Sequence, residues 1–337
     1  EEGGAPRRGC LLNPRRGGSG EQRIVVSLTT THDRIPSIGP VLESLLFQHH
    51  VLDVVYLWVP NRLRRETPPH MKFDRTVSHP ESIVPEKILE LQTRSMGRLV
   101  VRVVVDLGPI TKLIPILEAE QALNTIIILV DDDFVYSPLL VQELVRFSNP
   151  RTAVGVSTFT LKHDSVHDVR DGVLRSTENN CMRYTAVSAH QSEAHVLEAY
   201  LGIALQRSMF TDAFISHVIA SAENWTDNGP WLLADDLVVS FFLNASGVEL
   251  RNVRTTFVDR ESAGYAAVYA ETGLRSHHDT GVDPLTDQDE CCTNKPTGFD
   301  FNCDANMRRY RKYYKKLREV SVYMAQPQAA WKTRTEL

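Results

Sequence analysis

The chain lacks several features that would assign it to a class at once. It has no run of about 18 apolar residues, so no membrane-spanning helix is expected. It carries 37 Lys and Arg against 42 Asp and Glu, and this net charge of -5 gives no electrostatic basis for nucleic-acid binding. The P-loop spacing, GxxxxGKS or GxxxxGKT, is absent as well. With 337 residues and 42% hydrophobic content, we expect a folded globular protein.

Cysteine is scarce, and its placement bears on the cellular compartment. None of the five cysteines lies in a CxxC pair, which argues against a zinc site (Cys10, Cys181, Cys291, Cys292 and Cys303). The last four permit a disulfide in an oxidising compartment, and reduced thiols are the alternative. Sequons at Asn224 and Asn244 permit N-glycosylation. We therefore expect the lumen of the Golgi or the endoplasmic reticulum, with the cytoplasm as the alternative. The chain does not begin with Met, and we expect membrane contact only through an N-terminal anchor of a type II protein that precedes Glu1.

The order of apolar segments predicts the fold class. Residues 1–21 are rich in Gly, Arg, Pro and Ser and are predicted to form a flexible stem. Strands are predicted at 24–28, 54–59, 99–105 and 125–130, and helices at 38–46, 85–95 and 111–123. This alternation indicates an α/β fold with a mostly parallel central sheet flanked by helices. We expect one domain over 22–318 and a C-terminal tail over 319–337.

Three consecutive carboxylates, Asp131–Asp133 (the acidic triplet), follow the apolar segment 125–130. Open α/β sheets bind ligands at the carboxyl ends of their strands. Adjacent carboxylates repel one another unless a cation offsets their charge. The pattern therefore favours Mn²⁺ or Mg²⁺ bridging protein oxygens to a substrate phosphate. Capping of the next helix is the alternative, but Ser137 and Pro138 provide a better start for a helix over 138–147.

Two other strand ends carry polar side chains. Thr29, Thr30 and Arg34 follow the first strand, and the turn from Asp106 to Lys112 follows the third. Right-handed crossovers place the carboxyl ends of parallel strands at one edge, so these segments and the acidic triplet are expected to line a single crevice. Lys112 lies near a helix amino end, where it could meet a phosphate; a solvated lysine in a tight turn is equally supported.

A second group of candidates lies later in the chain. Asp235 and Asp236 (the acidic pair) precede the apolar helix predicted at 237–243. One is expected to cap this helix, and the other to face the crevice as a general base or to orient an acceptor hydroxyl. His277 and His278 could provide an imidazole ligand to the same metal, and surface exposure is the alternative.

Together these segments resemble the GT-A glycosyltransferase superfamily. The matching elements are Ser-Leu-Thr-Thr-x-x-x-Arg, Asp-x-Gly-Pro-x-Thr-Lys, Ile-Leu-Val-Asp-Asp-Asp and Asp-Asp-Leu, over about residues 23–280. In that superfamily an Asp-x-Asp (DXD) motif ends a central strand and binds Mn²⁺ or Mg²⁺ with a sugar nucleotide. The acidic triplet and the Asp-Asp-Leu helix are also similar to exostosin-like transferase domains. The resemblance implies a Rossmann-like GT-A fold with a single catalytic domain.

The resemblance also implies roles for individual residues. Asp133 would ligate the metal, Asp131 would contact the ribose and the metal, and Asp132 would support either. The remaining residues would lie at the base and ribose (Thr29, Thr30, Arg34), at the base or diphosphate (Asp106, Lys112), at the acceptor (Asp236, less so Asp235) and at the metal (His277 or His278).

The implied activity is a metal-dependent glycosyltransferase, a hexosyl- or pentosyltransferase. It would transfer sugar from a UDP-sugar to a hydroxyl of a glycan or glycoprotein. One alternative is a sugar-phosphate nucleotidyltransferase, a class that carries glycine and lysine in the loop after its first strand, whereas residues 29–34 contain neither. The other is a non-catalytic sugar- or protein-binding module on the same fold. Whether the reaction inverts or retains the anomeric centre stays open.

Overall fold

The computed structural model describes residues 22–63, 83–161, 184–186, 192–223, 232 and 235–253. The five cysteines, the sequon at Asn224, the two histidines His277 and His278 and the predicted terminal tails lie outside these residues. No helix within the described ranges is long and apolar enough to span a membrane.

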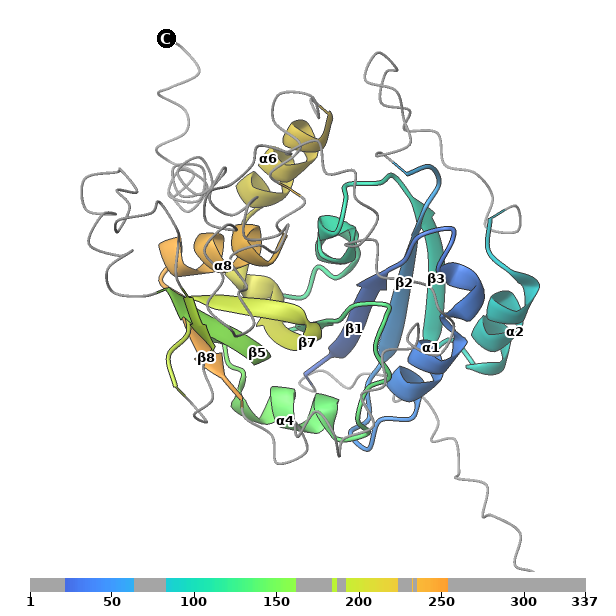
Figure 1. Ribbon diagram of the computed structural model, residues 1–337, viewed down its shortest axis with the longest axis horizontal. Coiled ribbons are helices and arrows are strands. Elements are labelled where there is room, and N and C mark those ends of the chain that lie inside the picture. The colour runs from blue at the N-terminus through green and yellow to red at the C-terminus, as the bar shows by residue number, and fades with distance from the viewer. Residues whose placement is uncertain are drawn as a thin grey trace, which may run out of the picture.

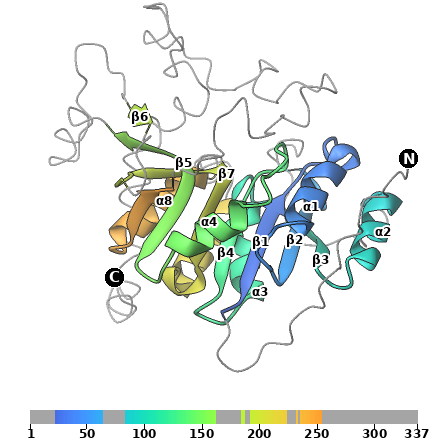
Figure 2. The ribbon, with the colours of Figure 1, turned by 90° about the horizontal axis from the view of Figure 1, so that it is seen from below.

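In the described residues eight strands form one sheet, in the order β3-β2-β1-β4-β7-β5-β6 (Figure 2), with β8 paired to β5 (Figure 1). The strands are β1 (Ile24–Thr29), β2 (Val54–Pro60), β3 (Leu99–Val104), β4 (Ile126–Leu129), β5 (Thr152–Leu161), β6 (Tyr184–Ala186), β7 (Val196–Gln206) and β8 (Glu249–Asn252). Strands β3, β2, β1 and β4 are parallel, as are β5 and β8, whereas β7 is antiparallel to both β4 and β5. The predicted α/β class is confirmed, and the arrangement of strands and helices is Rossmann-like.

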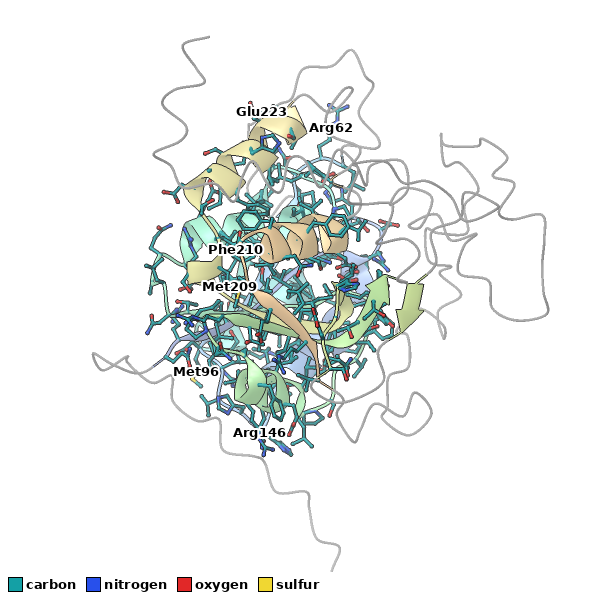
Figure 3. The ribbon with its side chains drawn as sticks, turned by 90° about the vertical axis from the view of Figure 1, so that its left-hand side faces the viewer. Arg62, Met96, Arg146, Met209, Phe210 and Glu223 are labelled. Carbon is teal, nitrogen blue, oxygen red and sulfur yellow. The ribbon has the colours of Figure 1, made fainter. Side chains whose placement is uncertain are left out.

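The apolar sequence of β4 explains its central place, because all four of its residues are buried. Ile127 and Leu129 pack on one face with α3 (Ile114–Ala119), α6 (Asp212–Glu223) and α8 (Asp235–Ala245). Ile126 and Ile128 pack on the other with α1 (Gly39–Leu46), α2 (Glu86–Arg94) and α4 (Leu140–Phe147). Figure 1 shows α6 and α8 on one side and α1, α2 and α4 on the other. In Figure 3, Glu223 of α6 and Arg146 of α4 mark the two outer layers.

The strand order creates a switch point between β1 and β4. The chain leaves β1 towards β2 through α1, on one face, and enters β4 from β3 through α3, on the other face. Open α/β sheets bind ligands outside the carboxyl ends of the strands at such a point. The segments that follow β1 and β4, which include Arg34 and the acidic triplet, therefore meet at the edge where a ligand is expected.

Helix bounds differ from the sequence prediction at α8, whose first turn contains Asp235 and Asp236 where the helix was predicted to start at residue 237, and at two helices near a proline. The helix predicted over 111–123 is a 3-10 helix, Ile110–Lys112, followed by α3, which ends at Ala119. Pro115 lacks the N–H that would continue a preceding helix, so a new helix begins around it. The helix predicted from 138 begins at Leu140 instead, after a turn in which the Ser137 hydroxyl accepts a 3.3 Å hydrogen bond from the Leu139 N–H.

Candidate active site

The middle residue of the acidic triplet points into the protein. Asp132 is 3% exposed, and its carboxylate accepts hydrogen bonds of 2.6 Å from the Thr30 hydroxyl and 2.6 Å from the Arg34 guanidinium. A second Arg34 nitrogen donates to Asp133 over 2.9 Å. The arginine therefore joins two neighbouring carboxylates, and it ties the segment after β1 to the segment after β4.

Burial governs the protonation of Asp132. The loss of solvent raises the pKa of its carboxyl to about 7, even though Arg34 and the Thr30 hydroxyl favour the charged form and lower it. A carboxylate this deep, with donors from another segment, acts as a cross-link between loops. Asp132 therefore links the segment after β4 to the segment after β1 through Thr30 and Arg34.

Lys112 joins the acidic triplet to the acidic pair. Its side chain is 5% exposed, and its ammonium contacts Asp131 over 2.5 Å and Asp235 over 2.9 Å. Burial disfavours its charge, but the carboxylates of Asp131, Asp235 and Asp236 together hold the pKa of Lys112 well above its ordinary value. The two acidic clusters, about a hundred positions apart in the sequence, thus share one buried cation.

The backbone around Lys112 is held by side chains of two strands. The Ser27 hydroxyl donates to the Lys112 carbonyl over 2.5 Å, and the Trp58 indole donates to the Ser27 hydroxyl over 2.8 Å. In the preceding turn Gly108 has a φ of 77°, and its N–H donates to the Asp106 carboxylate over 2.7 Å. This turn aims the lysine at the carboxyl end of β4 instead of leaving it in solvent.

The acidic pair divides its contacts between two neighbours. Asp235 faces Lys112, whereas the Asp236 carboxylate accepts a 3.1 Å hydrogen bond from the Ala199 N–H of β7. Burial raises the pKa of Asp235, and Lys112 lowers it in part. Burial, together with the negative charge of Asp235, raises the pKa of Asp236 well above its ordinary value. The residue as a whole is half-buried, at the first turn of α8.

The outer residues of the acidic triplet suit a hard divalent cation. The side chains of Asp131 and Asp133 are 33% and 27% exposed, against 4% for Asp132. One buried oxygen of Asp133 has no hydrogen-bond partner in the described part of the chain. Charged oxygens that lack donors are the ligands that Mn²⁺ and Mg²⁺ take.

These carboxylates do not amount to a metal site formed by protein alone. Within the described ranges, no three His, Cys, Asp or Glu side chains form a group that could hold a metal ion. Mg²⁺ commonly binds one or two carboxylates and completes its shell with phosphate oxygens and water. Asp131 and Asp133 fit such a shared site, and the proposed ligands His277 and His278 lie outside the described residues.

Several site residues predicted from the sequence lie at this edge with a structural partner. The Thr29 hydroxyl donates to the Trp58 carbonyl over 3.0 Å, and Asp106 accepts from its own turn. Thr30 and Arg34 contact the acidic triplet, and Lys112 contacts both acidic clusters. The predicted roles of these residues toward a nucleotide, and those of the carboxylates, stay predictions.

Sequence reasoning missed Tyr136. Its ring is buried, and its hydroxyl accepts from the Asp131 N–H over 2.9 Å while lying 2.9 Å from the Asp131 carbonyl and 3.1 Å from the Tyr200 carbonyl. The hydroxyl thereby connects the acidic triplet to β7. The only signal in the sequence is a tyrosine just before the proline turn, which an ordinary core residue would also explain.

No protein-family model and no curated protein sequence matches the chain. Among solved structures, it is similar to a 4-diphosphocytidyl-2C-methyl-D-erythritol synthase from Anaerococcus prevotii, with a TM-score of 0.35 and 14% identity over 59% of this chain and 76% of that one. A second synthase of that name has a TM-score of 0.34 and 11% identity, over 62% of this chain and 86% of that one. A third similar structure is glucosyl-3-phosphoglycerate synthase from Mycobacterium tuberculosis in complex with Mn²⁺, UDP and phosphoglyceric acid. Its TM-score is 0.27 and its identity is 18%, over 40% of this chain and 42% of that one. At these scores the similarity assigns no function, which must come from the side chains of the site.

Proposed function

We propose that the protein is a metal-dependent glycosyltransferase that transfers a sugar from a UDP-sugar to a hydroxyl of a glycan or glycoprotein. The observation that carries this proposal is the buried Lys112, which joins Asp131 after β4 to Asp235 at the start of α8. This contact supports the proposal because it brings the acidic triplet and the acidic pair together near the switch point of the sheet, where open α/β sheets bind ligands.

On the donor side, Asp131 and Asp133 would hold Mn²⁺ or Mg²⁺ together with the diphosphate. The ion, when bound, would supply positive charge that stabilises the leaving nucleoside diphosphate. Arg34 keeps Asp133 in place through its 2.9 Å contact. Lys112 offsets the charge of Asp131 and Asp235, so we assign it to positioning these carboxylates, whereas the family resemblance implied a place at the base or diphosphate.

On the acceptor side, Asp236 is the candidate base. The Ala199 N–H fixes one of its oxygens over 3.1 Å, and the raised pKa of Asp236 makes it a better proton acceptor than an exposed aspartate. A general base works best when its pKa approaches the operating pH. In an inverting reaction Asp236 would take the proton of the attacking hydroxyl; in a retaining reaction it would orient the acceptor.

Two alternatives receive less support. A nucleotidyltransferase would be expected to have glycine and lysine after β1, but residues 29–34 have neither, and Arg34 is engaged by two aspartates. A binding module would not need a group of buried carboxylates with raised pKa values, because such groups are costly to maintain and are typical of active sites.

Calorimetry with UDP, with and without Mn²⁺, followed by a hydrolysis assay over a panel of nucleotide sugars, tests the proposal. We expect Mn²⁺-dependent UDP binding and slow hydrolysis of one UDP-sugar. Asp133→Asn should lose both while it stays folded, whereas Asp212→Asn, whose side chain is 81% exposed on α6, serves as the matched control. Absence of metal-dependent UDP binding and of turnover in the wild type would overturn the proposal.

A further inference from the structure

The carboxyl end of α8 carries a sequence motif that the proposed chemistry does not use. Asn244, Ala245 and Ser246 form the sequon Asn-x-Ser, in which the middle residue is not proline. Such triplets also arise by chance, so the motif alone assigns no modification. A glycan on the folded protein requires that the asparagine amide reach solvent and that its neighbours leave room for a sugar. The contacts around Asn244 meet both requirements.

The sequon lies in an exposed turn. Asn244 and Ala245 are the last two residues of α8, and all residues from 244 to 247 are exposed. Gly247 follows the helix with a φ of 78°, and its N–H donates to the Asn244 carbonyl over 3.1 Å. A β-carbon built on Gly247 would meet no atom of the described residues within 4 Å. In this part of the chain the space beside the sequon is therefore open.

The Asn244 amide is held by the segment before β7 in a way that a glycan permits. Its Nδ2 donates to the His195 carbonyl over 3.1 Å. An asparagine amide nitrogen carries two hydrogens, and N-glycosylation replaces one of them. The other hydrogen can keep its contact with the His195 carbonyl, so the same hydrogen bond orients the side chain before and after modification. Attachment of a glycan is therefore compatible with this contact.

The position of Asn244 on α8 separates the sequon from the candidate active site. Asn244 follows Asp235 by nine residues, so at a rise of about 1.5 Å per residue the two lie about 14 Å apart along the helix axis. At about 100° per residue, nine positions also place Asn244 on the opposite side of α8 from Asp235. A glycan attached there starts on the far side of the helix from the contact between Asp235 and Lys112.

We propose that Asn244 is a site of N-linked glycosylation and that the folded protein accommodates the glycan without rearrangement. The co-substrate is an oligosaccharide carried on a lipid diphosphate in the lumen of the endoplasmic reticulum. The Asn244 nitrogen forms a bond to the anomeric carbon of this oligosaccharide, and the bond from that carbon to the diphosphate oxygen breaks. One amide proton is released, and the lipid diphosphate leaves. Glycosylation of Asn244 is independent of the proposed glycosyltransferase function.

The test uses the whole chain, expressed behind a cleavable secretion signal in animal cells, and two variants that separate the glycan from the hydrogen bond. Ser246→Ala removes the sequon but keeps Asn244 and its contact with His195, whereas Ser246→Thr keeps the hydroxyl that the motif requires. Secreted chain and chain retained in the lumen are both treated with peptide-N-glycosidase in heavy-oxygen water, which converts glycosylated asparagine into labelled aspartate. Peptide mass spectrometry then identifies the labelled position.

We expect the label at position 244 in the wild type and in Ser246→Thr, and no label at this position in Ser246→Ala. The glycosylated wild type should unfold at the same urea concentration as Ser246→Ala or at a higher one, because both keep the hydrogen bond to His195. Absence of the label at position 244 in the wild type would overturn the site. A lower urea midpoint for the glycosylated protein would show that the glycan displaces this contact, and would overturn its fit to the fold.

Discussion

Replacement of Lys112 by methionine tests the central contact of the site. Methionine fills similar space but removes the ammonium that lies 2.5 Å from Asp131 and 2.9 Å from Asp235. Removing one partner of a buried ion pair costs about 3–5 kcal/mol, since the remaining charge is left without compensation. Because the Asp131 side chain is 33% exposed and can be solvated, we expect the lower end of this range.

The loss of stability in the Lys112→Met variant should depend on pH, and the pKa of Asp235 decides whether it grows or shrinks as pH rises. Lys112 lowers the pKa of Asp235, which burial raises, so removal of the lysine raises that pKa further. A carboxyl whose pKa is higher in the folded than in the unfolded protein binds more protons when folded. Stability is therefore retained below the unfolded pKa, about 4, and is lost as pH rises towards the folded value. We expect the Lys112→Met variant to lose about 3 kcal/mol at pH 8 and less at pH 5.

Urea unfolding at pH 5 and pH 8 measures both effects. Lys87→Met, at an exposed lysine of α2, is the control and should change the unfolding free energy by less than about 0.5 kcal/mol. The double variant Lys112→Met/Asp235→Asn should recover part of the loss at pH 8, because it removes the buried charge as well. A loss below about 1 kcal/mol, or an equal loss at both pH values, would refute the assignment of Lys112 as the shared cation.

Three further predictions concern single side chains of the site. Burial raises the pKa of Asp132 from 3.8 to about 7, so the free energy of unfolding of the wild type should fall as pH rises from about 4 to 7. At 1.36 kcal/mol per pKa unit, the fall is at most roughly 4 kcal/mol. Urea unfolding of Asp132→Asn should lack this pH dependence, and an unchanged dependence would contradict the raised pKa of Asp132. Asp236→Asn should lower transferase turnover by about 100-fold or more while the Kd for UDP stays within about twofold, and normal turnover would remove Asp236 from the mechanism. Tyr136→Phe leaves the Asp131 N–H without its hydrogen-bond partner, so the free energy of unfolding should fall by about 1–3 kcal/mol and the KM for the donor should rise. A KM equal to that of the wild type would show that the hydroxyl does not position the acidic triplet.

Much of the sheet was predictable, because buried parallel strands are continuous apolar runs. The predicted strand ranges 24–28, 54–59 and 125–130 correspond to β1, β2 and β4, and the observed pairing is parallel. Helix boundaries were less predictable where proline intervenes. Periodicity continued through Pro115, but the missing N–H and the fixed φ of proline decided where α3 begins. The helix predicted to start at Pro138 begins two residues later, at Leu140.

The convergence of polar strand ends also followed from sequence, since right-handed crossovers leave the chain few alternatives. The direction of each side chain did not. Nothing in the three identical residues of the acidic triplet shows that Asp132 turns inward to Thr30 and Arg34, or that the outer two stay partly exposed. The sequence also did not predict which residue of the acidic pair contacts Lys112. Adjacent positions on a helix point in different directions, and the sequence does not show which direction faces the lysine.

The sequence by itself determined that acidic residues end a buried strand and begin a later helix, and that both lie within one α/β sheet. Only the tertiary structure decided that the buried ammonium of Lys112 lies between them, and that Tyr136 and β7 hold the acidic triplet in place. The physical reason is that local patterns specify secondary structure and strand order, whereas an ion pair or a buried hydrogen bond depends on distances of a few ångströms between residues far apart in the chain.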